Sequence, residues 1–470
     1  MLDRALRRPS PPHAEQKPVR SVQHGVERVD EFAWLRADNW QAVMRDPRLL
    51  DPEIRGYLEA ENAYADAALA DTAALQDTLF AEMKGRLKED ESTVPDPDGP
   101  FAYYVRYREG GQHPMICRTL REGGAEQLLL DGDALAAGKS FFHLGGSMHS
   151  PDQRLLAWTC DERGSEFFTA RVRDLECGRD LADDVPETSG SVVWTLDSQA
   201  FYYVRLDEQH RPSEVRLHRL GAPASEDALV FRTDDAGFFV SLSRLQSGRF
   251  AEISVHDHET AEAWLIDLAA PAAEPVLIAP REPSLRYEVE HHPSLNGEAS
   301  LILRTNADGA EDFKLVAAPL ATPGRAHWRD LVPHRPGIFI LSHLVLADWL
   351  IRLERADSLP RIVVRRLDSG EEHTIAFDEE AYSLGVEHGY EFATDTLRFG
   401  YSSMTTPTET WDYDLAKRTR FLRKRREVPS GHNPSDYVTR RLFAPAADAR
   451  ATRSAWSRTS PCGSPGCATC

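Results

Sequence analysis

The chain has 470 residues, of which 41% are hydrophobic and 28% charged, which is enough apolar material for two or three domains. Its formal net charge of −20 disfavours nucleic acid and anionic membranes as partners and favours cationic ones, such as short basic peptides. The sequence contains no run of about 18 apolar residues and no apolar signal segment after its first basic residues, so we expect a cytoplasmic protein.

The first part of the chain predicts an extended leader followed by a helical arm, together covering residues 1–80. Asp51 before Pro52 is a typical helix start, because an aspartate caps the first turn and proline fits its first position. Apolar residues then recur at helical spacing, first at Ile54, Tyr57, Leu58 and Tyr64, and later at Leu75, Leu79, Met83 and Leu87.

The pattern changes at the proline-rich stretch 92–100, after which short runs of β-branched and aromatic residues alternate with turns. The turn at Pro151 precedes the turn at Asp197 by 46 residues, and a further 99 residues, about two such units, lead to Asn296-Gly297. A period of about 40 to 50 residues is typical of β-propellers. The predicted fold is mainly β: a seven-bladed β-propeller over residues 81–430 with an N-terminal α-helical arm.

Residues 431–448 read as a linker, and residues 449–470 as an aberrant or disordered tail. No acidic residue follows Asp448, which resembles out-of-frame translation, with a genuine disordered tail as the alternative. Cys462, Cys467 and Cys470 have a C-x4-C-x2-C spacing, but an iron–sulfur site of that kind needs a fourth thiolate. The remaining cysteines behave as small hydrophobic residues: Cys117, Cys160 and Cys177.

One serine deserves comparison with a nucleophile elbow. Gly145-Gly146-Ser147 begins like Gly-x-Ser-x-Gly, but His149 stands where the second glycine is required. The segment also precedes a predicted propeller turn, and it does not join a strand to a helix. A structural role for Ser147 is therefore favoured over a catalytic one.

Two histidine groups could contribute metal ligands, His256 with His258 and His291 with His292. A catalytic zinc site needs three protein ligands and a structural one four, so a solvated hairpin is the favoured interpretation. The basic residues of 417–426 are interpreted as a solvated strand edge because their surroundings are acidic. We expect no catalytic, cofactor-binding or metal site and no cofactor.

Several segments resemble the prolyl oligopeptidase family of serine peptidases, and within it the oligopeptidase B group. The N-terminal signature lies at 24–36, with Pro12-His13 before it, and residues 57–64 are similar to the family's YLxxEN helix. Blade segments are similar at Val193-Trp194, at 201–205 and at 399–407, and the last of these is the most specific.

The resemblance implies a seven-bladed propeller paired with an α/β-hydrolase domain, to which the N-terminal arm belongs structurally. In the family the propeller is a gate that admits short peptides, and oligopeptidase B cleaves them after Arg or Lys. Its catalytic Ser, Asp and His lie in the hydrolase domain, with the serine in a Gly-Gly-Ser-x-Gly-Gly elbow.

This chain departs from the family pattern near Asp448, after which nothing matches the hydrolase domain. We therefore expect a truncated oligopeptidase B-like chain that is inactive alone, because acyl transfer needs nucleophile, base and oxyanion donors together. The alternatives are a non-catalytic propeller that binds ligands, or a gate subunit that assembles in trans with a separate hydrolase domain.

Overall fold

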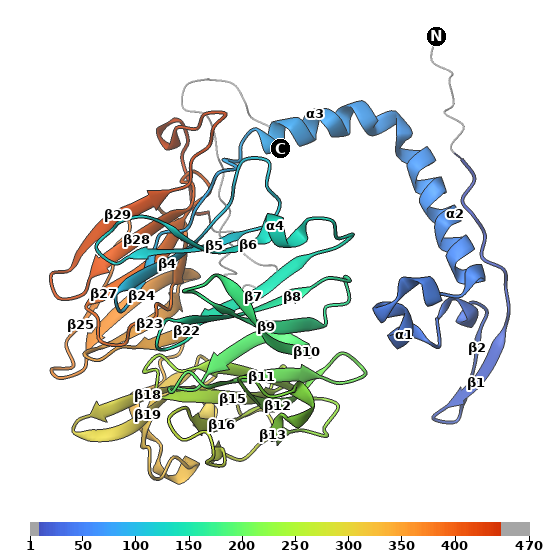
Figure 1. Ribbon diagram of the computed structural model, residues 1–470. Coiled ribbons are helices and arrows are strands. Elements are labelled where there is room, and N and C mark those ends of the chain that lie inside the picture. Colours follow the sequence, from blue (N-terminus) through green and yellow to red (C-terminus); the bar gives the residue numbers. More distant parts are fainter. Residues whose placement is uncertain (1–8, 443–470) are drawn as a thin grey trace, which may run out of the picture.

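A computed structural model describes residues 9–442, which form a ring of antiparallel sheets and an N-terminal arm (Figure 1). The arm begins with a hairpin, β1 (Val19–Gln23) and β2 (Val26–Asp30), whose turn holds His24 and Gly25 at positive φ. The apolar pattern does not predict this hairpin. Its signal is the His24-Gly25 pair, since Gly adopts positive φ without strain.

The helical arm is present, with α1 (Trp40–Arg45), α2 (Pro52–Leu69) and α3 (Ala73–Lys84). Asp51 caps α2 as expected, since its carboxylate accepts hydrogen bonds from the backbone N–H groups of Glu53 and Ile54 at 2.8 and 3.4 Å. The predicted start of this helix, Asp51-Pro52, is therefore confirmed.

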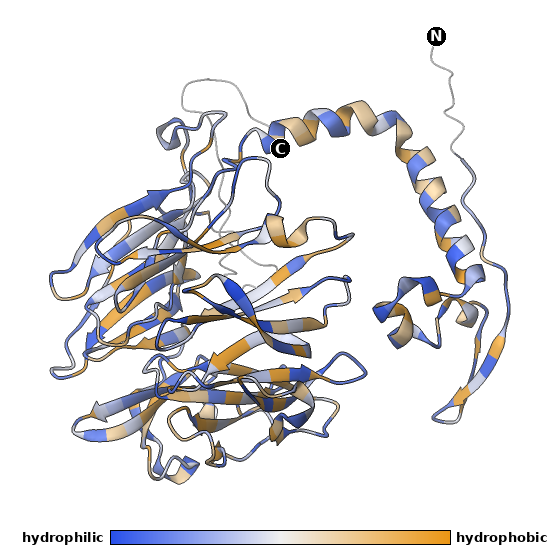
Figure 2. Cartoon of the chain, viewed as in Figure 1, coloured by the Kyte–Doolittle hydropathy of each residue, from blue (hydrophilic) through white to orange (hydrophobic). Residues whose placement is uncertain are grey.

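The apolar side of the arm is uncovered, although both helices carry apolar residues along their length (Figure 2). Ile54 is the one buried residue of α2, and α3 has none. Leu75 and Met83 are 58% and 57% exposed, respectively. None of the helices in the described part of the chain has the length and apolarity needed to span a membrane.

The ring is built from 27 strands, β3 to β29. Five sheets have four strands each and follow one another along the chain. They are β3 (Asp96–Asp98), β4 (Phe101–Arg106), β5 (Met115–Leu120) and β6 (Gln127–Asp131); β14 (Phe239–Arg244), β15 (Phe250–His256), β16 (Ala261–Asp267) and β17 (Val276–Ala279); β18 (Tyr287–Leu295), β19 (Glu298–Thr305), β20 (Lys314–Pro319) and β21 (Arg329–Val332); β22 (Ile338–Val345), β23 (Trp349–Ala356), β24 (Leu359–Arg366) and β25 (Glu372–Thr374); and β26 (Ser383–Val386), β27 (Thr396–Ser402), β28 (Glu409–Asp414) and β29 (Thr419–Arg425).

The remaining strands form one seven-stranded sheet in the order β13-β12-β11-β10-β9-β8-β7. They are β7 (His143–His149), β8 (Leu155–Asp161), β9 (Phe168–Asp174), β10 (Arg179–Trp194), β11 (Ala200–Leu206), β12 (Pro212–Arg219) and β13 (Ala228–Arg232). A short helix, α4 (Gly132–Ala136), precedes β7.

The prediction of a seven-bladed propeller is wrong: the structure has five four-stranded blades, joined in the ring by the seven-stranded sheet. The physical reason is β10, a strand of 16 residues. Its first part pairs with β9 and its second part with β11, with register shifts between them. Hydrogen bonding is therefore continuous across the place where the 46-residue spacing of the turns predicts a break between two blades.

The turns that suggested the period are real. Ser198 and Asn296 both have positive φ, and Gly297 completes a two-residue hairpin between β18 and β19. The blades need one another, because each buries its apolar faces against a neighbouring sheet.

Six clusters of buried apolar residues fill the junctions around the ring. One of them, around Val172 and Phe201, lies within the seven-stranded sheet, and the others join successive sheets. Among the described residues no such cluster joins β3–β6 to β26–β29, where the ring closes. We call this junction the ring seam.

Candidate functional site: the channel mouth and the ring seam

The connection from β26 to β27, residues 387–395, is the longest of its kind in the ring, and we call it the mouth loop. The corresponding connections between the first two strands of each other unit have two to five residues, whereas this one has nine. Because these connections all lie on the same side of the ring, the extra length lets the mouth loop cross the central opening on that side.

Hydrogen bonds fasten the mouth loop to the sheets around it. The side-chain amide of Gln246, only 7% exposed, donates to the carbonyl oxygens of Gly389 and Glu391 at 2.9 and 3.1 Å. The backbone N–H of Ala347 donates to Phe392 at 3.0 Å, and the Trp349 indole donates to Asp395 at 2.8 Å.

The loop also reaches the sheets on the other side of the opening. Glu391 pairs with Arg121 of the β3–β6 sheet and accepts a hydrogen bond from the Gly99 N–H at 3.3 Å. The Phe392 ring lies 5.6 Å from that of His292 on β18. With His149 of β7 beside Tyr390, the mouth loop contacts all five of the other sheets in the ring.

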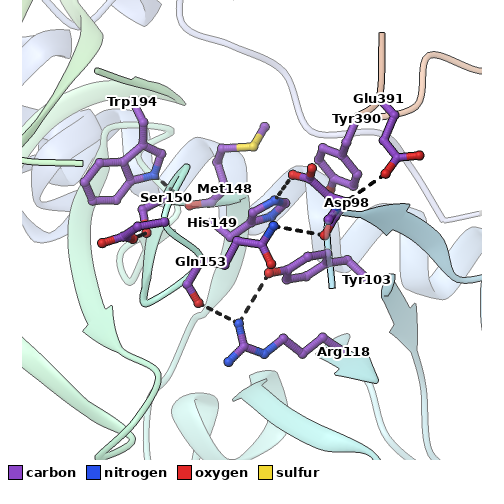
Figure 3. Close-up of polar contacts among 12 residues, drawn as sticks. Asp98, Tyr103, Arg118, Met148, His149, Ser150, Gln153, Trp194, Tyr390 and Glu391 are labelled. Carbon is purple, nitrogen blue, oxygen red and sulfur yellow. Dashed lines mark hydrogen bonds and ion pairs between the residues drawn. The ribbon is translucent and has the colours of Figure 1, made fainter. Parts of the chain in front are cut away.

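A cluster of side chains around His149 supports the loop (Figure 3). The His149 ring nitrogen Nε2 lies 2.6 Å from the Asp98 carboxylate, and the ring stacks on Tyr103 at 3.8 Å between centroids. Tyr390 of the mouth loop packs edge-on against His149 at 4.8 Å. Gln153 adds a hydrogen bond to the Asp98 carbonyl oxygen at 2.9 Å. The imidazole is thus held by a carboxylate and two aromatic rings.

The ring seam is polar and hollow. The Lys424 ammonium group contacts the Glu91 carboxylate and the Ser92 carbonyl oxygen, and Arg398 donates to the carbonyl oxygen of Pro95 at 3.0 Å. Two cavities, of about 830 and 450 Å³, open on it, and Glu387 at the start of the mouth loop lines both.

Negative charge is in excess at this point. Arg398 donates to both carboxylate oxygens of Asp412 at 2.8 and 3.1 Å and lies 3.7 Å from the Asp96 carboxylate, and Arg423 also pairs with Asp412. The three carboxyl groups of Asp96, Glu387 and Asp412 thus share two guanidinium groups. Burial raises the pKa of Asp96 to about 6, although Arg398 opposes the shift, and burial also raises the pKa of Glu387. A cation placed beside these two carboxyl groups would stabilise their ionised form.

A second acidic pair lies deeper, between the β14–β17 and β18–β21 sheets. Burial raises the pKa of Glu252 to about 8 and that of Glu290 to about 7. The carboxylate of Glu290 accepts a hydrogen bond from the backbone N–H of Gln246, the residue that holds the mouth loop. The pair therefore stands directly behind the anchor of the loop.

Ser147 lies on β7 and lines a cavity of about 220 Å³ together with His149. The two residues are separated by one position on a strand, and among the described contacts no hydrogen bond joins Ser147 to His149 or to another base. His149 is instead bound by Asp98. A serine nucleophile needs a base within hydrogen-bond reach, and this arrangement does not supply one.

The histidine groups considered as metal ligands do not meet. His291 packs against Phe250 at the start of β15, whereas His256 ends that strand. Ser247 and the Ala347 carbonyl oxygen are the partners of His291 and His292. Within residues 9–442, no three His, Cys, Asp or Glu side chains are placed to hold a metal ion.

The basic residues near the C-terminal edge of the ring are occupied by partners. Lys417 pairs with Asp414, Arg418 with Glu371, and Arg425 with Glu409. This pairing favours the interpretation as a strand edge. The predicted tail, including Cys462, Cys467 and Cys470, lies outside the described residues.

The sequence does not point to the mouth loop or the ring seam. The sequence feature that could have indicated the mouth loop is the distance between β26 and β27, which is longer than a hairpin needs. This distance can be recognised only after the bounds of both strands are known.

Comparison with known proteins agrees with this architecture. Residues 11–426 match the family described as prolyl oligopeptidase, N-terminal beta-propeller domain. The chain is 35% identical to dipeptidyl aminopeptidase BI of Pseudoxanthomonas mexicana, over 94% of this chain and 61% of the relative. It is 26% identical to Protease 2 of Moraxella lacunata, over 92% of this chain and 61% of that protein.

Two solved structures superpose closely. Oligopeptidase B from Leishmania major gives a TM-score of 0.86 at 28% identity, over 94% of this chain and 64% of that one. Oligopeptidase B from Trypanosoma brucei, with covalently bound antipain, gives 0.84 at 29% identity with the same coverage. The chain thus spans less than two thirds of the length of these relatives.

Proposed function

Since this chain belongs to the prolyl oligopeptidase family and carries its N-terminal β-propeller region, we propose that it is the gate of a serine endopeptidase that cleaves short peptides after Arg or Lys. The observation that carries the gating role is the mouth loop, which contacts all five of the other sheets and would narrow its end of a central channel to a width that a folded protein cannot pass. Only short, extended peptides would then reach a catalytic centre behind the ring.

The preference for basic peptides is supported by charge. Asp96 and Glu387 are partly buried carboxyl groups at the ring seam, and Arg398 divides its charge between Asp96 and Asp412. A peptide guanidinium or ammonium group would complete their hydrogen bonding. The net charge of −20 also favours cationic peptides, because it attracts them to the molecule as a whole.

We further propose that this chain does not cleave peptides alone. In the described residues the strongest serine candidate, Ser147, has no base hydrogen-bonded to it, and residues 11–426 match the family's propeller domain, whereas the family's catalytic residues belong to its hydrolase domain. The uncovered apolar side of α2 and α3 is the surface that such a domain would cover. Binding without catalysis, or assembly in trans with a separate hydrolase domain, are the other possibilities.

The purified 470-residue chain is expected to show no turnover of a short Arg-containing fluorogenic peptide, with or without a serine-directed inhibitor. Inhibitor-sensitive turnover that persists through repeated purification would contradict this expectation, and Ser147→Ala would then be the first variant to assay. Saturable, inhibitor-insensitive binding of the same peptide without turnover would support the gate or the binding module.

The arm is expected to cause self-association, because exposed apolar patches of this kind associate in water. Light scattering and binding of the dye ANS would measure it. Leu79→Glu combined with Met83→Glu should reduce both signals, whereas Phe421→Glu, an exposed apolar residue of similar size on β29, should change them little. A monodisperse, ANS-negative wild-type monomer would show that the arm surface is covered in solution.

A further inference from the structure

Residues 403–408 form the turn between β27 and β28 and include the end of the 399–407 segment, the most specific family motif in the sequence. The Ser403 hydroxyl accepts hydrogen bonds from the backbone N–H groups of Thr405 and Thr406 at 3.0 and 2.8 Å. The Ser403 N–H in turn donates to the Thr406 carbonyl oxygen at 3.0 Å. These bonds fix a compact turn of the kind that serine favours.

The carboxylate of Glu379 fixes this turn to the ring. Its carboxylate accepts hydrogen bonds from the hydroxyl groups of Tyr401, Thr405 and Thr406 at 2.8, 3.1 and 2.7 Å. Burial opposes the charge on this carboxylate, but the hydroxyl groups around it lower its pKa overall. An ionised Glu379 with three hydroxyl donors is a stable support, because each donor satisfies part of the buried charge.

The chain returns over the same turn after β29. We call residues 432–441 the exit segment. His432 donates through Nε2 to the Thr405 carbonyl oxygen at 2.7 Å, and the hydroxyl of Thr439, a buried residue, lies 3.3 Å from that of Thr405. The Glu380 carboxylate accepts from the Arg440 side chain at 2.6 Å and from the Arg441 N–H at 3.0 Å.

The residues between β29 and the exit segment are held more loosely. Residues 427–431 are mostly exposed. Their contacts in the described structure are the ion pair of Glu427 with Lys88 at 2.8 Å and one backbone turn, from the Gly431 N–H to the Val428 carbonyl oxygen. Gly431 has a φ of 91°, which a residue with a side chain would adopt only with strain. If nothing held the exit segment, residues 427–431 would be the hinge between the ring and the exit segment.

We propose that the 403–406 turn, with Glu379 and Glu380 as positioning residues, is a latch that fixes the exit segment to the ring. The chain is then fixed to the ring as far as Arg441. This inference does not rest on the proposed function, since the latch would hold equally in a propeller that only binds ligands.

The latch is tested in the complete chain with His432→Phe and Glu380→Gln. The first keeps an aromatic ring beside Tyr437 and removes the donor to Thr405; the second keeps the size of the side chain and removes its charge. Hydrogen exchange of the backbone amides of 432–441, and tryptic cleavage after Arg440 and Arg441, are expected to become about tenfold faster in the double variant. The thermal unfolding midpoint should stay unchanged, which separates release of the segment from loss of the fold.

Glu371→Gln is the matched control, because Glu371 is an exposed glutamate of the neighbouring sheet that pairs with Arg418 and does not contact the exit segment. Unchanged exchange and cleavage of 432–441 in the double variant would overturn the latch. So would exchange in the wild-type chain that is already as fast as in an unstructured peptide. Thr405→Val provides an independent variant from the ring side of the contact and should accelerate exchange in the same segment.

Discussion

Replacing Glu354 by glutamine is expected to lower the free energy of unfolding by about 1.5 to 3 kcal/mol, because the buried Arg352 loses one of its two carboxylate partners and keeps only Glu372. Glu354 and Arg352 are adjacent on one face of β23, and both side chains are fully buried. Glu354 accepts hydrogen bonds from Arg352 at 2.8 Å and from Arg361 at 2.7 Å, and it also pairs with Arg335.

The pH dependence follows from the same contacts. Burial raises the pKa of Glu354, but the guanidinium groups of Arg352 and Arg361 outweigh burial, so the net shift is downward. A carboxyl group with a lowered pKa stabilises the fold above the pKa it has when unfolded, and this contribution is lost as the pH falls through the folded value. The difference in the free energy of unfolding between wild type and variant should therefore be largest at pH 7 and shrink below about pH 4.

Urea unfolding followed by tryptophan fluorescence would measure both effects. Glu371→Gln serves again as the control, since its partner Arg418 is exposed, and its unfolding midpoint should match that of the wild type. A Glu354→Gln variant as stable as the wild type at pH 7 would mean that the cluster around Arg352 is hydrated in solution.

Glu252→Gln is expected to raise the free energy of unfolding relative to wild type, with the larger effect toward high pH. The folded-state pKa of Glu252 is about 8, against a usual value of 4.5, because the side chain is buried beside Glu290. The folded state therefore binds a proton that the unfolded state releases, and wild-type stability declines as the pH rises from about 4.5 to about 8. Glutamine cannot ionise, so the variant should gain on the order of 3 kcal/mol relative to wild type between pH 5 and pH 9.

Thermal unfolding of both proteins across this pH range gives the comparison directly. Glu259→Gln is the control, because Glu259 lies in the exposed hairpin that follows the same strand. Parallel stability curves for wild type and Glu252→Gln would contradict the buried position of this carboxyl group. A gain that grows from about pH 5 and levels off near pH 8 would match the ionisation of Glu252, which lies beside the Glu290 that supports Gln246 and the mouth loop.

Local structure could be predicted from the sequence wherever a short stretch of residues determines it. Asp51-Pro52 marks the start of α2, and Asn296-Gly297 marks a two-residue hairpin, because both depend on neighbouring residues alone. The β1–β2 hairpin was harder to predict, since its strands bury nothing and show no apolar alternation.

Long-range contacts could not be predicted in the same way. The number of blades was wrong because spacing between turns does not reveal whether β10 continues from one unit into the next. The candidate site depends on similar contacts: Gln246 meets Gly389 only because two sheets face each other across the ring. A single sequence carries the length of the mouth loop but not the identity of its partners.

The shared strand β10 also limits how this ring can change in evolution. A four-stranded blade bounded by loops can be duplicated or deleted as a unit, since the cut falls in exposed connections and leaves complete sheets on both sides. Within β7–β13 no such cut exists, because removing either half would split β10 and expose unpaired strand edges. Gain or loss of a repeat is therefore expected in the five separate blades, while β7–β13 is inherited as a single indivisible segment.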